Sequence, residues 1–174
     1  MGSFAFDYVA RQKVAGIHLR AFTLKQLPVP GPDQVADLGQ ILTAAIAELA
    51  ATSWDTSLLR RSLGAPDPPS LWNETRRELL RAELDAAFFH IYGMARHDVD
   101  YIMDTFPIVR RKDEGEYSEY RTKRLILEVY DRMAEAITSG QPYETLLDPP
   151  PADPSLCHDP STRPDWADLY LPSD

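Results

Sequence analysis

Cysteine is almost absent from this sequence, since Cys157 is the only one in 174 residues. One cysteine cannot form an internal disulfide, and it cannot supply the several thiolates of a structural zinc site. Apolar residues never run uninterrupted for the roughly 18 positions that a membrane-spanning helix needs, and the first residues lack the charged and apolar regions of a secretory signal. These features predict a protein of a reducing, cytoplasmic compartment that neither crosses a membrane nor is exported.

Positive charge is also scarce. The formal net charge is -9 and the pI is about 4.9, which argues against non-specific binding to DNA, because phosphate contacts come from clustered Lys and Arg. Residues 33–104 and 141–174 each carry a net charge of -6, whereas residues 1–27 have four cations against Asp7 alone and residues 105–140 are balanced. The sequence therefore has two basic islands in an acidic chain.

Motifs that carry catalysis are missing as well. No glycine-rich strand-to-helix loop for a nucleotide or S-adenosylmethionine occurs, and no Gly-x-Ser-x-Gly. The tetrapeptides DPPS (67–70) and DPPP (148–151) lack the aromatic residue that stacks on a flipped base in adenine methyltransferases. No lysine follows an acid by two positions, as the commonest restriction-nuclease site requires. The sequence predicts no catalytic residue, no metal site and no cofactor.

Helical periodicity is what the sequence does contain, and its length suits one domain. The prolines between residues 28 and 32 favour an extended segment, and residues 108–116, which follow the helix end expected ahead of Pro107, are expected to form a polar connector. Helices are predicted over residues 3–14, 33–53, 70–92, 96–105 and 117–138, with a turn or short helix over 54–63. The expected fold class is mainly α, a helical bundle of three long helices plus shorter ones.

Three regions follow from this pattern: an N-terminal segment (1–32) that ends in the extended proline run, a helical domain (33–140) and a C-terminal tail (141–174). The tail holds eight prolines and seven acids, a composition typical of disorder. Its apolar residues qualify that interpretation, because aromatic side chains can anchor a tail on a surface. These residues are Trp166, Leu169, Tyr170 and Leu171.

Three blocks of the sequence resemble one family. FDYVARQKVAGIHLRAFTLKQLPVP is similar to the segment that closes the target-recognition region of large adenine-N6 DNA methyltransferases, among them fused type IIG restriction enzymes and phage-exclusion methylases. PGPDQVADLGQILTAAIAELA resembles the helix entered through a proline turn after a recognition domain, and residues 81–133 look like the C-terminal helical block of these enzymes. The resemblance implies a C-terminal fragment of a restriction-modification or phage-defence protein. The catalytic core would lie elsewhere, so the isolated chain is expected to be inactive.

The basic islands and the resemblance together give eight candidate DNA contacts. The first island would contact phosphate or base edges through Arg11, Lys13 and Lys25. The second would contact phosphate through Arg110, Arg111, Lys112, Arg121 and Lys123. Acids are interleaved with the second island, so a solvated, salt-bridged helix face is the alternative interpretation.

Two functions are therefore expected. The first is a DNA-recognition and helical spacer module of an adenine-N6 DNA methyltransferase, with duplex DNA and a methyltransferase catalytic domain or subunit as partners. The alternative is a non-enzymatic helical module for protein–protein contacts that does not bind DNA by itself, which the net charge favours. Duplex binding at low salt separates the two.

Overall fold

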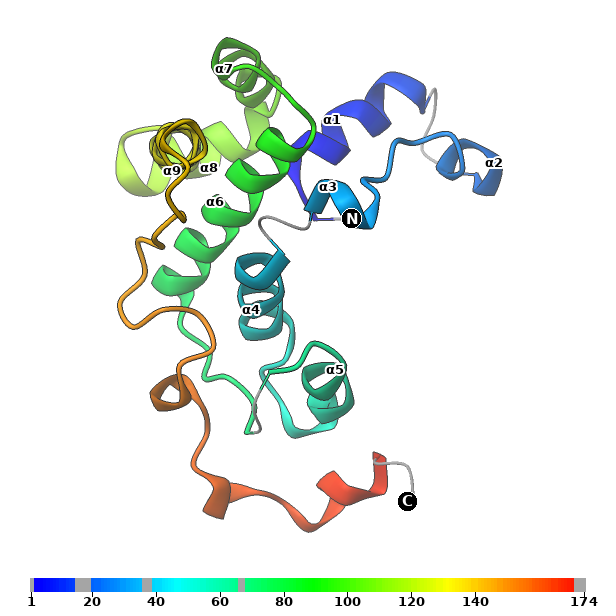
Figure 1. Cartoon of the computed structure of the whole chain (residues 1–174), viewed down its shortest axis with the longest axis vertical. Helices are drawn as coiled ribbons and strands as arrows, with labels where there is room; N and C mark the ends of the chain where they lie inside the picture. Colours follow the sequence, from blue (N-terminus) through cyan, green and yellow to red (C-terminus); the bar gives the residue numbers. More distant parts are fainter. Residues whose placement is uncertain (1, 15–19, 36–38, 66–67, 171–174) are drawn as a thin grey trace. The chain divides into compact units, whose positions relative to one another are not determined.

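The chain is mainly helical, as predicted, and no β-strand occurs in the residues that the structure describes (Figure 1). The structure is a computed structural model that describes residues 2–14, 20–35, 39–65 and 68–170. The chain divides into two compact units. Unit 1 comprises residues 1–36 and 81–144, and unit 2 comprises residues 37–80 and 145–174. Helix α6 (Glu74–Ile91) contributes its first residues to unit 2 and the remainder to unit 1.

Unit 1 begins with α1 (Phe4–Lys13), whose N-cap is Ser3 and which confirms the helix predicted over residues 3–14. The Ser3 hydroxyl accepts a hydrogen bond from the amide of Phe6 at 3.2 Å, which satisfies one of the amides left unpaired at a helix start. Two short helices follow, α2 (Ala21–Leu24) and α3 (Pro32–Val35). Helix α2 precedes the proline run for which an extended segment was expected, and residues 28–31 of that run are not helical.

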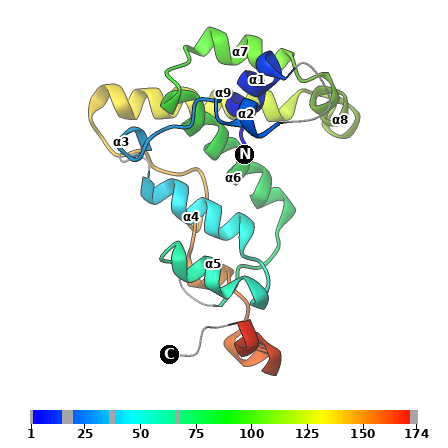
Figure 2. The same ribbon diagram turned by 90° about the vertical axis from the view of Figure 1, so that its right-hand side faces the viewer.

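The core of unit 1 lies between the second part of α6, α7 (Arg96–Asp104) and α9 (Arg121–Ser139). Helices α7 and α8 both pack against α9, and α1 packs against α7 (Figure 2). The apolar stripes are spaced by three and four residues, so each helix buries one face. The buried side chains of this core are Ala86, Ala87, Phe89, Val99, Ile102, Met103, Phe106, Ile126, Val129 and Met133.

Glycines end two of these helices, as predicted. Gly93 follows α6 with φ +65°, and Gly140 follows α9 with φ +69°. Only glycine adopts this left-handed conformation without strain, which is why it closes helices so often.

The expected polar connector at residues 108–116 is instead part of a helix, α8 (Pro107–Tyr117). Pro107 ends α7 and also begins α8, because proline lacks an amide hydrogen and its fixed φ suits the first helical position. Only Asp113 of α8 is buried. The helix is therefore a largely exposed element at the edge of the unit 1 core.

Unit 2 contains α4 (Gly39–Ala50), a 3-10 turn η2 (Trp54–Thr56) and α5 (Ser57–Ser62). The single helix predicted over residues 33–53 is thus represented by α3 and α4, with residues 36–38 outside the described part. The turn or short helix predicted at 54–63 is confirmed.

The tail packs into unit 2 through 3-10 turns, η3 (Pro154–Leu156), η4 (Pro160–Thr162) and η5 (Asp165–Tyr170). The amide of Leu71 donates to the carbonyl of Leu156 at 2.7 Å, and the amide of His158 donates to the carbonyl of Pro69 at 2.8 Å. Leu147 is buried in the same unit. The anchoring role expected for Leu171 falls outside the described residues.

Candidate functional site

All eight candidate DNA contacts lie in unit 1, on α1, α8, α9 and the end of α2. The structure brings part of the first island to the second. The guanidinium of Arg11 stacks over the ring of Phe106 at 4.5 Å from its centre, and Phe106 is the N-cap residue of α8. Phe4 contacts the same ring edge-on, with 4.8 Å between ring centres. Arg11 therefore lies at the start of the helix that carries Arg110, Arg111 and Lys112.

Two of these cations form ion pairs on their own helices. Arg11 contacts Asp7 at 2.7 Å, and Arg110 contacts Glu114 at 2.7 Å. The hydrogen bond with Glu114 raises the pKa of Arg110 above its ordinary value. Both pairs are about half exposed, so solvent screens them strongly, but each places a carboxylate beside a cation that phosphate would need.

Lys123 is the most fully neutralised of the eight. Its ammonium lies 3.0 Å from the carboxylate of Asp100 and 2.9 Å from that of Asp104, and the side chain is 16% exposed. Burial lowers the pKa of Lys123, but the hydrogen bonds that its ammonium donates to Asp104 and Asp100 outweigh burial and leave the pKa above its ordinary value. Two carboxylates thus surround one ammonium, so the three groups together carry a net negative charge.

The N-terminus of α9 holds an acidic side chain of the chain itself. The amide of Thr122 donates to the buried carboxylate of Asp113 at 2.6 Å. A carboxylate at this position satisfies an unpaired amide and interacts favourably with the helix dipole. Arg121, the first residue of α9, stacks over the ring of Tyr117 at 4.5 Å.

Four of the eight candidates are exposed and form no ion pair with another described residue: Lys13, Lys25, Arg111 and Lys112. Arg111 donates from Nε to the carbonyl of Pro107 at 3.3 Å. Only Arg111 and Lys112 are adjacent, so the unpaired positive charge of unit 1 is concentrated on α8.

A groove of about 510 Å³ lies on α9 next to α7 and is lined by charges of both signs. Arg96 pairs with Asp131 at 2.7 Å, and Arg124 pairs with Glu119 at 3.0 Å. Tyr120 and Leu127 supply apolar surface between them. Such a mixed lining suits a polypeptide surface better than a phosphate, because a phosphate would meet a carboxylate beside each cation.

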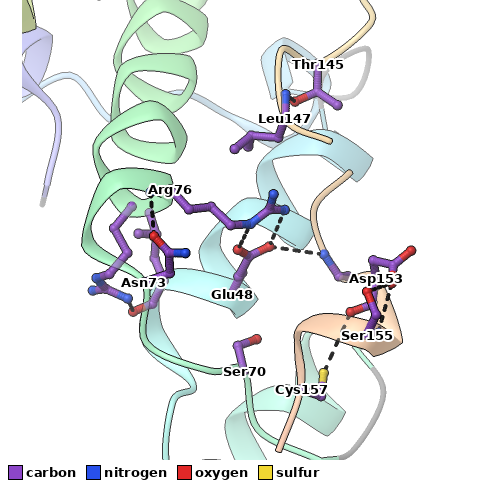
Figure 3. A network of polar contacts seen from close by, with 12 residues as sticks. Glu48, Ser70, Asn73, Arg76, Thr145, Leu147, Asp153, Ser155 and Cys157 are labelled. Atoms are coloured by element: carbon purple, nitrogen blue, oxygen red, sulfur yellow. Dashed lines mark hydrogen bonds and ion pairs between the residues drawn. The ribbon is translucent and has the colours of Figure 1, made fainter. Parts of the chain in front are cut away.

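Sequence analysis missed a buried polar network in unit 2 (Figure 3). Glu48 and Arg76 form a buried ion pair, and the amide of Ala152 also donates to Glu48, at 3.4 Å. Fully buried Arg60 donates to the Ser70 hydroxyl at 2.7 Å and contacts the Cys157 sulfur at 3.6 Å. The partners come from α4, α5, α6 and the tail, so the network ties the tail to the helices of unit 2.

Unit 1 has a buried acid of its own. The carboxylate of Asp85 on α6 accepts a hydrogen bond from the amide of Phe4, the first residue of α1, at 2.7 Å. Burial raises the pKa of Asp85 to about 7, and the Phe4 hydrogen bond opposes that rise. The hydrogen bond at the first residue of α1 is therefore linked to the ionisation of one carboxyl group.

Groups of three or more His, Cys, Asp or Glu side chains able to hold a metal do not occur within the described ranges. In those ranges, no helix combines the length and the apolar character needed to cross a membrane. Comparisons with protein-family models, with curated proteins and with solved structures gave no match for this chain.

Proposed function

We propose that the chain is a helical protein–protein interaction module that does not bind DNA by itself. The main observation behind this proposal is that several candidate cations already form ion pairs with carboxylates of the same chain. Lys123 is enclosed by Asp100 and Asp104, while Arg11 and Arg110 are paired with Asp7 and Glu114. A cation already paired with a carboxylate must give up that partner before it can bind phosphate, which reduces its contribution to DNA affinity.

The charge balance supports the same proposal. Non-specific DNA binders neutralise about 6–10 phosphates, whereas unit 1 offers few cations without a carboxylate partner among the described residues. The net charge of -9 adds long-range repulsion from the duplex. In contrast, surfaces of mixed charge with exposed apolar residues are typical of protein interfaces. A cytoplasmic location, favoured by the lone Cys157, belongs to this proposal.

A titration of a fluorescently labelled duplex with the purified chain tests the proposal. At about 50 mM salt, where phosphate contacts are strongest, we expect no saturable rise in anisotropy. Saturable binding that weakens steeply with salt would contradict the interaction module. The variant Arg111→Ala with Lys112→Ala then reports whether α8 supplies the contacts, and Arg132→Ala is its control, since Arg132 pairs with Glu128 away from α8.

A second function, the DNA-contacting adjunct of an adenine-N6 DNA methyltransferase in a restriction-modification or phage-defence system, is favoured by one observation. Arg11 stacks on Phe106, so one cation of the first island lies at the start of the helix that carries three of the second. A catalytic partner would then present the DNA to this surface. The prediction is that Arg110→Ala with Arg111→Ala lowers duplex affinity and makes its salt dependence shallower; unchanged affinity and slope would remove α8 from this function.

A further inference from the structure

We propose that the partner of this module is a second copy of the same chain, held by α8 of each copy against α7 of the other. The inference rests on the proposed interaction function and names its partner. It follows from two faces of unit 1 that are complementary in charge and that both expose a large apolar side chain. The α7 face comprises Asp98, Tyr101 and Asp104, and the α8 face comprises Ile108, Arg111 and Lys112.

The α8 face is built from a helix that packs on only one side. Ile108 is 74% exposed, and Arg111 and Lys112 follow it by three and four residues, so the three side chains share one side of the helix. Gly115, one turn further, adds no side chain, and a Cβ built there would meet nothing within 4 Å. A backbone without a side chain on an exposed helix allows close approach of another element. The face is therefore basic, aliphatic and open.

The α7 face has the opposite charge. Tyr101 is 63% exposed, and Asp98 and Asp104 lie three residues before and after it. Asp104 and Asp100 both pair with the ammonium of Lys123. One cation therefore neutralises only one of the two carboxylates at that end of the helix. Among the described residues, the one ion-pair partner of Asp98 is the exposed imidazole ring of His97, at 3.5 Å. The face is acidic and aromatic, with net negative charge.

A second copy is the occupant for which this chain itself supplies the chemistry. Helices α7 and α8 follow one another in unit 1 (Figure 2), so a two-fold arrangement lets each α8 face meet an α7 face, and every contact occurs twice. Such a self-complementary contact closes on itself and gives a dimer. Arg and Tyr side chains are also those that most often dominate the affinity of protein interfaces.

Nucleic acid fits these faces less well than a second copy. A duplex large enough to contact Arg111 and Lys112 would bring phosphates towards the carboxylates of neighbouring α7, which cost affinity by like-charge repulsion. The exposed Ile108 and Tyr101 would also remain in water. In the dimer both apolar side chains are covered and both cations gain carboxylate partners.

Sedimentation-velocity centrifugation of the full chain over a range of concentrations tests the inference. We expect a monomer–dimer equilibrium in the unmodified chain. An α8 variant, Ile108→Glu with Arg111→Glu, and an α7 variant, Asp98→Lys with Tyr101→Lys, should each weaken the dimer at least about tenfold, as the loss of a central interface contact does. The control Ile137→Glu changes an isoleucine that is 60% exposed on α9, outside both faces, and should leave the dimer unchanged.

Mixing the two variants provides the decisive arm. In the heterodimer, an α8 face made acidic meets an α7 face made basic, and the second contact keeps both native faces. We therefore expect the mixture to form dimers at a concentration at which each variant alone is monomeric. The substituted side chains are exposed, and unchanged circular dichroism of each variant shows that it has folded.

A chain that stays monomeric at every concentration overturns the inference, as does a dimer that both variants leave intact. These failures are distinct from failure of the proposed function, which would be saturable DNA binding by the unmodified chain. DNA binding that the α8 variant abolishes would assign that face to phosphate instead.

Discussion

Substitution of Asp85 by asparagine should remove a large part of the pH dependence of unit 1 stability. Asp85 is 5% exposed, and its carboxylate accepts the hydrogen bond of the Phe4 amide. Asparagine keeps a side-chain oxygen that can accept the same bond, and it has nearly the same shape. The variant therefore changes the ionisation of this position while it preserves the contact between α6 and the start of α1.

The sign and size of the effect follow from the two pKa values. Burial raises the pKa of Asp85 from its ordinary 3.8 to about 7 in the folded chain. Between these values the unfolded chain has lost the proton and the folded chain still holds it, so the free energy of unfolding falls as the pH rises. At about 1.4 kcal/mol per pH unit the total loss is about 4 kcal/mol. The loss is complete once the pH passes the folded value.

Urea unfolding followed by circular dichroism, between pH 4 and pH 8, measures this loss. The difference in free energy of unfolding, Asp85→Asn minus unmodified chain, should grow across that range by about 4 kcal/mol and then level off. Groups common to both chains cancel in the difference. Asp33→Asn, at an exposed position of α3, is the matched control. A difference that stays constant from pH 4 to pH 8 would refute the assignment of a protonated, buried Asp85.

Three further predictions concern stability. Arg76→Ala leaves Glu48 buried without its cation, so the free energy of unfolding should fall by about 3–5 kcal/mol, and a thermal melt with no shift would show that the pair is dispensable. Ser3→Ala removes the oxygen that accepts the Phe6 amide, which should cost about 1 kcal/mol and speed hydrogen exchange in α1 above all; uniform exchange rates would contradict this. Gly140→Ala has open space for its Cβ but φ +69°, so we expect a loss of about 1 kcal/mol in urea unfolding from backbone strain alone, and an unchanged or higher stability would argue against it.

Local chemistry explains which elements could be predicted from sequence. Ser3 begins α1, and Gly93 and Gly140 close α6 and α9, because caps depend on residues within one turn of the helix end. The periodic stripes of α7 and α9 were equally readable, since each helix buries one side. These signals need no knowledge of the rest of the chain.

Helix α8 was missed because Pro107 was interpreted only as the end of the preceding helix. Proline is over-represented at the first position of a helix and is also common shortly after a helix end. The spacing of Val109, Asp113 and Tyr117 contained the signal, as all three are turned inwards or half-buried while their neighbours are exposed. Because Asp113 is acidic, the segment was interpreted as polar along its whole length.

Long-range pairs account for what no local pattern could supply. Glu48 and Arg76 are 28 residues apart, and Arg60 and Cys157 are 97 apart. The tail is held by backbone hydrogen bonds as well as by side chains, and its proline-rich composition does not encode them. In the candidate site, the pairing of Arg110 with Glu114 could be expected from their four-residue spacing, whereas Lys123 meets Asp100 and Asp104 only because α7 packs on α9.

We propose that this chain pairs several of its candidate cations with its own carboxylates and acts through protein contacts. Anisotropy of a labelled duplex, titrated with the unmodified chain at about 50 mM salt, tests that claim most directly. We expect the anisotropy to stay constant throughout the titration. A saturable curve that shifts to weaker affinity in proportion to added salt would contradict it.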